Sequence, residues 1–220
     1  MSALQISIKG HSFTPNRIFC IGKNYDEHIK ELGGKTPEEP VVFMKPVTSI
    51  EVPFQTICMP RHGKLLHHEV EVVLLIGKEG RDVSELDSLS YIAGVTVGLD
   101  LTLRDVQSRL KKASLPWEIS KSFEQSAPLG IFKSYDPDII NLQNLSFSCS
   151  VNKDIRQRGN TCDMLFPINS LICILSRLWV LRPGDIIYTG TPSGVGPLES
   201  GDRVYIESPV IGSFSWTLAS

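Results

Sequence analysis

Two carboxylates interrupt an apolar run in Leu66-His67-His68-Glu69-Val70-Glu71-Val72-Val73-Leu74-Leu75-Ile76-Gly77. Side chains alternate between the two faces of a β-strand, so a strand here places Glu69 and Glu71 on the same face. The apolar, β-branched residues after Glu71 predict a strand that is buried on both faces. Two like charges are costly in such a place unless a positive group lies between them. The alternative is an edge strand whose two glutamates face water.

A third acid ends a second β-rich run, Val95-Thr96-Val97-Gly98-Leu99-Asp100-Leu101. The next residues, Thr102-Leu103-Arg104-Asp105, resemble a capping box, which predicts the start of a helix. Asp100 then either joins the two glutamates or supports the N-terminus of that helix. Three carboxylates together favour Mg²⁺, Mn²⁺ or Ca²⁺ over zinc, which prefers His and Cys ligands. The sequence therefore predicts a divalent metal site at Glu69, Glu71 and Asp100.

Composition favours one catalytic domain over residues 1–220. The chain is 41% hydrophobic and contains 17 Gly and 14 Pro, which suits short strands and turns. A net charge of −2 and an isoelectric point near 6.2 give no basic surface for nucleic acid, so we expect a small-molecule substrate. The first residues, 1–5, have no leader-like pattern and no apolar run is long enough to cross a bilayer, so we expect a cytoplasmic protein without membrane attachment.

The cysteines show neither CxxC spacing nor an even number, which argues against a disulfide framework or a zinc site. We expect all of them to be small buried side chains in a reducing compartment. They are Cys20, Cys58, Cys149, Cys162 and Cys173.

Several further residues can carry chemistry. A short helix predicted over residues 24–32 places His28 and Glu31 on one face, either as a surface contact or as a pair that activates a water molecule. Lys45 closes the predicted strand 41–44 and either faces a site or is a solvated strand end.

The helix after Asp100 places Arg104 and Gln107 three residues apart, where both can face one ligand. The glycine-rich loop 190–196 lacks the Lys of a phosphate-binding loop, so it does not predict nucleotide binding. Its backbone N–H groups and Thr191 can instead face a carboxylate.

The remaining pattern predicts mostly strands. We expect two N-terminal strands, 4–9 and 17–21, joined by a turn at 14–16. We also expect a strand with one wet face at 145–151 and an apolar helix stripe at 171–179. Further strands are predicted at 186–189, 202–208 and 213–218.

In this order, the motifs resemble those of the fumarylacetoacetate hydrolase family, and specifically its short acylpyruvase and oxaloacetate decarboxylase or tautomerase members. The motifs are Cys20-Ile21-Gly22-Lys23-Asn24-Tyr25, His67-His68-Glu69-Val70-Glu71, Leu99 to Gln107, Leu115-Pro116-Trp117, Lys121-Ser122-Phe123 and Thr189 to Gly196. The resemblance implies an α+β fold, a mixed β-sheet roll with a few short helices, assembled as a homodimer.

The same resemblance implies roles for individual residues. Glu69, Glu71 and Asp100 correspond to carboxylate ligands of Mg²⁺ or Mn²⁺. Arg104, Gln107 and Thr191 fall where the family binds its substrate. The catalytic positions are those of Lys121, His28 and Glu31, and the last two of these lie on the family's lid helix.

We therefore expect a metal-dependent enzyme acting on small 2-oxo and 2,4-dioxo acids through a stabilised enolate. Tautomerisation or decarboxylation of oxaloacetate and hydrolysis of the C–C bond of an acylpyruvate all pass through such an enolate. An alternative is a hydrolase or isomerase of a larger dioxo acid from aromatic catabolism. A non-catalytic metal-binding scaffold is the alternative from another class.

Overall fold

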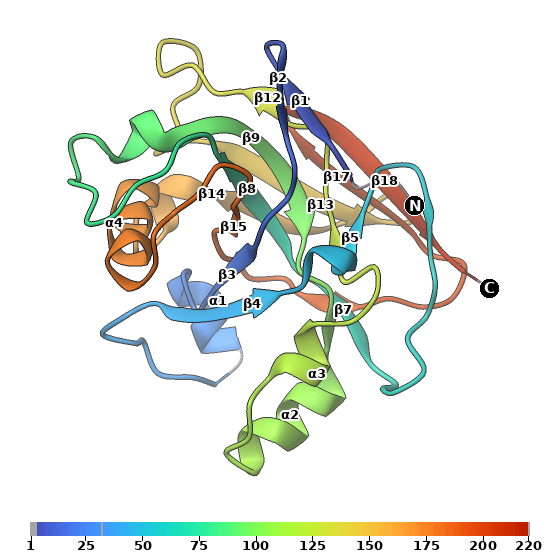
Figure 1. The fold of residues 1–220 in the computed structure, drawn as a ribbon. Coiled ribbons are helices and arrows are strands. Elements are labelled where there is room, and N and C mark those ends of the chain that lie inside the picture. The colour runs from blue at the N-terminus through green and yellow to red at the C-terminus, as the bar shows by residue number, and fades with distance from the viewer. Residues whose placement is uncertain (1–3, 32, 220) are drawn as a thin grey trace.

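A six-stranded mixed sheet runs through the middle of the molecule (Figure 1). The structure is a computed structural model that describes residues 4–31 and 33–219. The strand order is β12-β9-β8-β15-β3-β4, in which only β15 and β3 are parallel neighbours. These strands are β3 (Ile18–Gly22), β4 (Val41–Lys45), β8 (Val70–Ile76), β9 (Ile92–Leu99), β12 (Lys133–Ser134) and β15 (Ile186–Tyr188).

Strand β8 is buried along its whole length, which confirms a strand covered on both faces. Val72 and Leu74 join the larger hydrophobic cluster of the protein. Val73 and Leu75 point the other way and join a smaller cluster that includes Cys20. The alternative of a solvated edge strand is therefore wrong.

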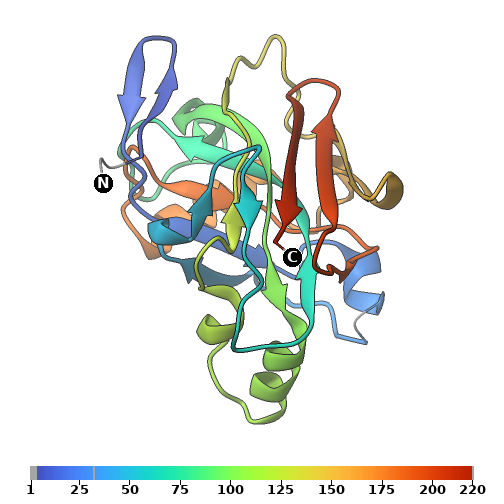
Figure 2. The ribbon, with the colours of Figure 1, turned by 90° about the vertical axis from the view of Figure 1, so that its right-hand side faces the viewer.

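A second sheet has the order β14-β13-β17-β18-β6. Its strands are β6 (Thr56–Ile57), β13 (Ser146–Val151), β14 (Asp154–Asn160), β17 (Arg203–Ser208) and β18 (Gly212–Leu218). Buried residues alternate with more exposed ones along β13 and β17, as the sequence predicts for one wet face. Figure 2 shows β17 and β18 side by side, in red.

The remaining strands form three small sheets. In one of them, β7 (Leu66–His68) lies between β10 (Thr102–Leu103) and β16 (Gly196–Pro197). Another pairs β5 (Ile50–Glu51) with β11 (Ala127–Pro128), and the third is the hairpin of β1 (Ile6–Ile8) and β2 (His11–Phe13). Because β7 and β8 belong to different sheets, the chain passes from one sheet to the other at Glu69.

Four α-helices are found among the described residues: α1 (Asp26–Glu31), α2 (Arg104–Lys112), α3 (Glu118–Lys121) and α4 (Ile168–Leu178). Short 3₁₀ turns occur at Val47–Ser49, Ser88–Tyr91 and Thr161–Asp163. Helices α2 and α3 lie together at the end of the molecule opposite the β1–β2 hairpin (Figure 1). None of the helices in the described part of the chain is both long and hydrophobic enough to cross a bilayer. Residues 1–3, and Leu32 at the end of the first predicted helix, lie outside the described residues.

The N-terminal prediction missed one strand. The predicted strand 4–9 does not run on to a turn at 14–16; it turns back at Lys9 and Gly10, and β2 pairs with β1. Both residues have positive φ, 46° and 82°, as a two-residue hairpin turn requires. The second predicted strand is β3.

The predicted capping box is also wrong. Thr102 belongs to β10 and pairs with His67, and its hydroxyl donates to the carbonyl of Asp100. Asp105 accepts hydrogen bonds from the backbone N–H groups of Lys64 and Leu65 instead. Helix α2 consequently starts at residue 104 without a side-chain cap.

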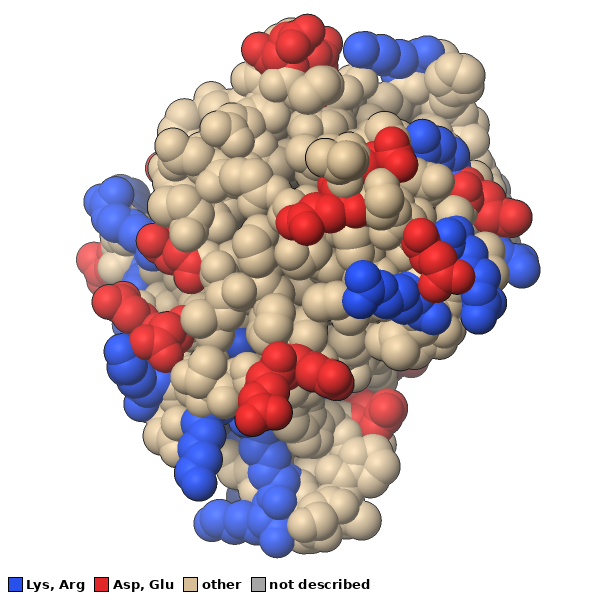
Figure 3. All heavy atoms as spheres, turned by 90° about the vertical axis from the view of Figure 1, so that its left-hand side faces the viewer, with Lys and Arg blue, Asp and Glu red and all other residues tan. Residues whose placement is uncertain are grey.

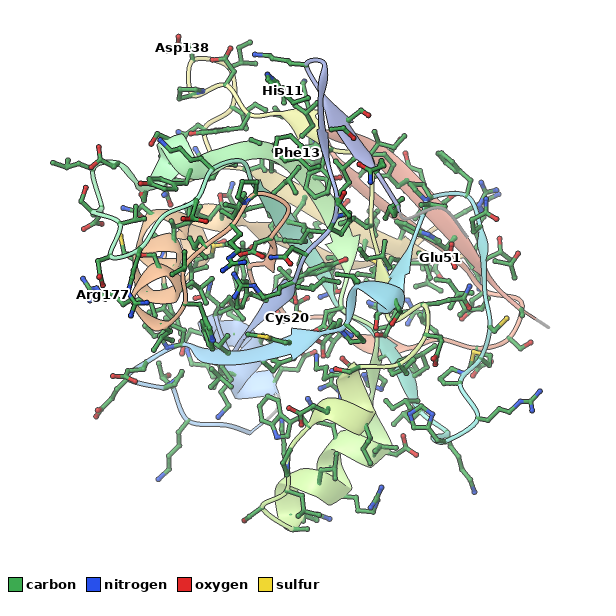
Figure 4. The ribbon with its side chains drawn as sticks, in the orientation of Figure 1. His11, Phe13, Cys20, Glu51, Asp138 and Arg177 are labelled. Atoms are coloured by element: carbon green, nitrogen blue, oxygen red, sulfur yellow. The ribbon has the colours of Figure 1, made fainter. Side chains whose placement is uncertain are left out.

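The cysteines form no disulfide among the described residues, but not all of them are buried. Cys20 lies in the interior on β3 (Figure 4), and two others are buried, whereas Cys58 and Cys162 are exposed, which corrects the sequence-based expectation. On the face drawn in Figure 3, acidic and basic side chains are interspersed with uncharged surface.

Candidate metal centre and active site

The three predicted metal ligands meet at one point, although Asp100 lies 29 positions after Glu71 in the sequence. Glu69 lies between β7 and β8, Glu71 lies within β8, and Asp100 directly follows β9. The β8–β9 pairing brings them together, and Asp100 N–H donates to the carbonyl of Glu69 at 2.9 Å. All three are buried, and their candidate ligand oxygens lie within 4.8 Å of one another. We call these residues the acid cluster.

Two cations neutralise Glu69. The Nζ of Lys121 lies 2.8 Å from Glu69 Oε2 and 2.5 Å from Asp100 Oδ2. Arg104 donates from Nη2 to Glu69 Oε1. Burial alone would raise the pKa of Glu69, but Lys121 and Arg104 hold it well below its usual value. Burial likewise acts to lower the pKa of Lys121, but Asp100 and Glu69 raise it, so its ammonium stays charged.

Glu71 differs from its neighbours because it forms no ion pair among the described residues. Its Oε2 accepts a hydrogen bond from the backbone N–H of Gly190 at 2.6 Å. Burial, and next the charge of Asp100, raise the pKa of Glu71 well above its ordinary value. Within the described chain, Asp100 Oδ1 is buried and accepts no well-aligned hydrogen bond. Three crowded carboxylates, one of them without an ion pair among the described residues, fit a divalent cation with oxygen ligands.

Lys45 belongs to this centre, which the sequence left open between a site and a solvated strand end. Its side chain is fully buried, and its Nζ lies 2.9 Å from Asp100 Oδ1. It also donates to the carbonyl of Leu101 at 3.2 Å and to that of Lys121. The solvated alternative is wrong, because β4 lies against the segment that follows β9 instead of ending in solvent.

The acid cluster opens into a cavity of about 350 Å³. All the predicted site residues except Glu31 line this cavity. Further lining residues, to which the sequence assigned no role, are Lys23, Phe43, Lys111 and Trp117.

Helix α2 supplies one wall of the cavity. Arg104 and Gln107 face the same way, as predicted, and Arg104 Nη1 donates to Gln107 Oε1 at 2.7 Å. Burial, and then the nearby Arg104, lower the pKa of His67 to about 4, so this imidazole is neutral at pH 7. Because the guanidinium has five N–H groups, it keeps donors for a ligand after bonding to Glu69 and Gln107.

Helix α1 supplies another wall of the cavity. His28 Nδ1 lies 3.3 Å from Glu31 Oε2, so the two predicted partners are in contact. His28 is buried, and burial lowers its pKa, which favours the neutral imidazole. Glu31 in turn accepts hydrogen bonds from the N–H of Gly194 at 3.1 and 3.2 Å.

The glycine-rich loop presents its N–H groups to carboxylates, as predicted, but the carboxylates belong to the protein itself. Gly190 donates to Glu71, and Gly194 donates to Glu31. Gly190 has φ +106°, and a Cβ on it would lie 2.7 Å from the Cβ of Asn24, so only glycine fits. The loop thereby connects the acid cluster to helix α1.

Two aromatic rings in another part of the cavity wall make cation–π contacts with lysine side chains. The ring centroids of Phe43 and Trp117 lie 6.1 Å apart. Lys121 Nζ lies 4.9 Å from the Phe43 centroid, and Lys111 Nζ lies 4.8 Å from the Trp117 centroid. Burial, and then Arg104 and Lys121, lower the pKa of Lys111 to about 8. Sequence spacing gave no signal for this arrangement, because three separate segments form it.

Comparison with known proteins agrees with the geometry. A family model described as "Fumarylacetoacetate (FAA) hydrolase C-terminal" matches residues 17–219. An oxaloacetate tautomerase of Escherichia coli (strain K12) is 45% identical over 191 residues, which cover 87% of this chain and 87% of the relative. A mitochondrial oxaloacetate decarboxylase of Dictyostelium discoideum is 42% identical over 192 residues, covering 87% of this chain and 88% of the relative.

A solved structure shares the complete fold. The crystal structure of fumarylpyruvate hydrolase from Pseudomonas aeruginosa, in complex with Mn²⁺ and pyruvate, aligns with a TM-score of 0.94 and 31% sequence identity. The alignment covers 100% of this chain and 97% of that one. It confirms the expected mixed-sheet α+β fold with few helices, and its Mn²⁺ supports a divalent metal ion as the cofactor. With a family model matching almost the whole chain, the protein belongs to the fumarylacetoacetate hydrolase family of metal-dependent enzymes.

Proposed function

We propose that this protein acts on small 2-oxo acids, with oxaloacetate tautomerisation and decarboxylation as the principal reactions. The observation that carries the proposal is the acid cluster, which lies beside Lys121 and opens into a cavity of about 350 Å³. Relatives described as an oxaloacetate tautomerase and an oxaloacetate decarboxylase support this choice of substrate.

The charges around the acid cluster support a dianionic substrate. Its three carboxylates are matched by Lys45, Lys121 and Arg104, so these six side chains sum to zero when all are ionised. A divalent ion held by the acid cluster would add two positive charges and supply a Lewis acid that polarises the 2-oxo group. Oxaloacetate carries two negative charges and would restore neutrality.

Lys121 is suited to stabilise negative charge on the substrate. Its ammonium is buried and held by Glu69 and Asp100, and its raised pKa keeps the proton on Nζ. It therefore serves as a fixed positive charge and hydrogen-bond donor beside the developing enolate oxygen. Arg104 and Gln107 on α2 bind the carboxylate at the other end of the acid.

Hydrolysis of acylpyruvates is a second candidate activity, favoured by His28 and Glu31. A buried, neutral imidazole next to a carboxylate can take a proton from water, which makes that water a nucleophile. His28 lines the cavity, whereas Glu31 stands behind it and orients the ring. The solved fumarylpyruvate hydrolase supports this second activity.

The test follows oxaloacetate and acetylpyruvate by NMR with purified protein. We expect EDTA to abolish both activities and Mg²⁺ to restore them. Full activity in chelator would remove the metal from the proposal. Mg²⁺ binding without turnover of either acid would support the non-catalytic scaffold, and turnover of only a larger dioxo acid would support the aromatic-catabolism alternative.

A substitution of His28 tests whether this residue acts in hydrolysis alone. His28→Asn should abolish acetylpyruvate hydrolysis and leave Mg²⁺ affinity and oxaloacetate tautomerisation within a small factor of the original protein. His11→Asn is the matched control, because His11 is exposed on the β1–β2 hairpin (Figure 4) and does not line the cavity. Equal loss of both activities in His28→Asn would contradict the proposed role.

We further propose that the chain works as a homodimer. Large apolar side chains on its surface support this, including Phe54, which is 68% exposed, and Ile119, which is 52% exposed. Light scattering after size-exclusion chromatography tests the oligomeric state, and a monomer at micromolar concentration would contradict it. We also propose that residues 1–220 form a single domain and that the protein is cytoplasmic.

A further inference from the structure

Gln157 lies where strand β8 loses one of its neighbours. The last residue of β15, Tyr188, pairs with Val73, so Val70 lies beyond the end of that ladder. Side chains supply the hydrogen bonds there instead. The N–H of Val70 donates to Oε1 of Gln157 at 3.0 Å, and the Thr191 hydroxyl donates to the Val70 carbonyl at 2.9 Å.

The orientation of the Gln157 amide is fixed by two backbone groups. The N–H of Val70 can only donate, so it must face Oε1. The carbonyl of Pro192 can only accept, so it must face Nε2, which lies 2.9 Å away. Turning the amide over would oppose like groups at both positions. The second hydrogen of Nε2 therefore points to Thr191 Oγ1 at 2.8 Å.

These contacts determine what the Thr191 hydroxyl can offer a ligand. The group has one hydrogen and two lone pairs. The hydrogen is donated to Val70, and one lone pair accepts from Gln157. One lone pair remains, on a residue that lines the cavity. Thr191 can thus accept a further hydrogen bond but cannot donate one.

His68 completes the arrangement. Its Nδ1 lies 2.9 Å from Oε1 of Gln157, an acceptor, so Nδ1 carries the hydrogen. Nε2 of His68 then carries no hydrogen, and within the described chain it is buried without a hydrogen-bond partner. In the Gln157 amide, both lone pairs of Oε1 accept hydrogen bonds and both hydrogens of its Nε2 are donated. Gln157 is therefore a fully bonded, immobile positioning residue.

We propose that Gln157 makes Thr191 a pure hydrogen-bond acceptor, so that this wall of the cavity binds a donor group of the ligand, such as an enol hydroxyl or a water molecule. The inference rests on the proposed function and deepens it: Lys121 faces the 2-oxo oxygen while that oxygen is an enolate, and Thr191 accepts a hydrogen bond from the same oxygen once it is protonated to the enol. This differs from the sequence-based expectation, in which Thr191 faces a carboxylate.

The first test needs neither metal nor substrate. Long-range ¹H–¹⁵N NMR of the histidine-labelled, metal-free protein reports which ring nitrogen of each histidine carries hydrogen, and His68→Asn assigns the signals. We expect His68 to be the Nδ1–H tautomer. The Nε2–H tautomer would overturn the assignment of the whole chain of hydrogen bonds.

The second test uses two nearly isosteric anions on Mg²⁺-loaded protein, with binding measured by calorimetry. Oxalate has only acceptor oxygens, whereas oxamate carries an NH₂ donor. Thr191→Val should weaken oxamate binding roughly three- to tenfold and change oxalate binding less than about twofold. Thr191→Ser keeps the hydroxyl and should restore the affinity for oxamate.

The outcomes separate this inference from the proposed function. Equal weakening of both anions, or no change in either, would refute the acceptor role of Thr191. If the predicted tautomer and the oxamate-selective effect are found but oxaloacetate is not turned over, the proposed function fails and the inference about Thr191 stands.

Discussion

Replacing Glu71 by Gln removes one negative charge from the acid cluster and keeps the size of the side chain. In the metal-free protein this charge is unfavourable, because Glu71 has no ion pair and its candidate ligand oxygens lie within 4.8 Å of those of Glu69 and Asp100. Two unit charges 4.8 Å apart repel by about 3.5 kcal/mol at an effective dielectric constant of about 20. The Gly190 N–H and the nearby cations offset part of this repulsion.

We therefore expect Glu71→Gln to raise the free energy of unfolding in EDTA at pH 8 by about 1–3 kcal/mol. Glu69→Gln provides the matched comparison two residues away. It breaks the ion pairs of Glu69 with Lys121 and Arg104, so it should lower the free energy of unfolding by about 3–5 kcal/mol. The same chemical change should thus alter the free energy of unfolding in opposite directions at two positions that are only two residues apart.

The pH dependence has a definite sign. The folded-state pKa of Glu71 lies above its unfolded value, so its favourable contribution is present below about pH 4.3 and is lost as the pH rises through the folded-state pKa. The stability advantage of Glu71→Gln should therefore grow with pH and be smallest in acid.

Urea denaturation followed by tryptophan fluorescence measures these changes, in EDTA and in saturating Mg²⁺. A metal present at a hundred times its dissociation constant should stabilise the original protein by about 2.7 kcal/mol, and this gain should disappear in Glu71→Gln. The reasoning would be refuted if Glu71→Gln lost more than about 1 kcal/mol in EDTA, or if it kept the full Mg²⁺ effect.

Three further predictions concern the surroundings of the acid cluster. Lys45→Met removes the cation beside Asp100 Oδ1 and leaves Asp100 paired with Lys121 alone, so it should lower the free energy of unfolding in urea by about 1–3 kcal/mol. Lys112→Met, at an exposed position, should change it by less than about 0.5 kcal/mol. A similar value for both variants would contradict the ion pair. Lys111 has a pKa of about 8, so its ammonium charge is lost above that pH. Because this removes a positive charge from the cavity wall, the KM for oxaloacetate should rise roughly two- to fivefold between pH 7 and 9. Lys111→Gln should abolish this rise, whereas Lys112→Gln should not. Gly190→Ala places a Cβ 2.7 Å from the Cβ of Asn24 at a φ of +106°, and should weaken Mg²⁺ binding measured by calorimetry. Gly201→Ala is the control, because Gly201 also has positive φ but no atom within 4 Å of the added Cβ. Equal Mg²⁺ affinities of the two variants would contradict the prediction.

The acid cluster was predictable because two strand patterns determine it. Alternation places Glu69 and Glu71 on one face, and the end of the next β-rich run places Asp100 beside them once β8 and β9 pair. The pair Arg104 and Gln107 follows in the same way from helical spacing. Local periodicity is sufficient wherever the contact lies within one element or between adjacent strands.

The parts that the sequence did not reveal depend on contacts between distant segments. Lys45 looked like a strand end because its partner Asp100 is 55 positions away, and nothing local marks it as buried. Gln157 lies in the more exposed β14, where its neighbours give no sign of a buried amide. Thr102 carries a capping signal, but pairing with β7 overrides this local preference.

The transfer of the chain between two sheets at Glu69 places the three acids on or beside strands, whereas helices and loops shape much of the pocket around them. The acid cluster stands on β8, β9 and the turn before β8, whereas α1 and the segment from α2 to Trp117 form the surrounding walls. An engineer can therefore randomise Lys23, Lys111 and Trp117, which line the cavity outside the strands and are not buried, and keep the acid cluster and every strand unaltered. Selection from such a library should yield variants with new acid preferences and unchanged melting temperatures.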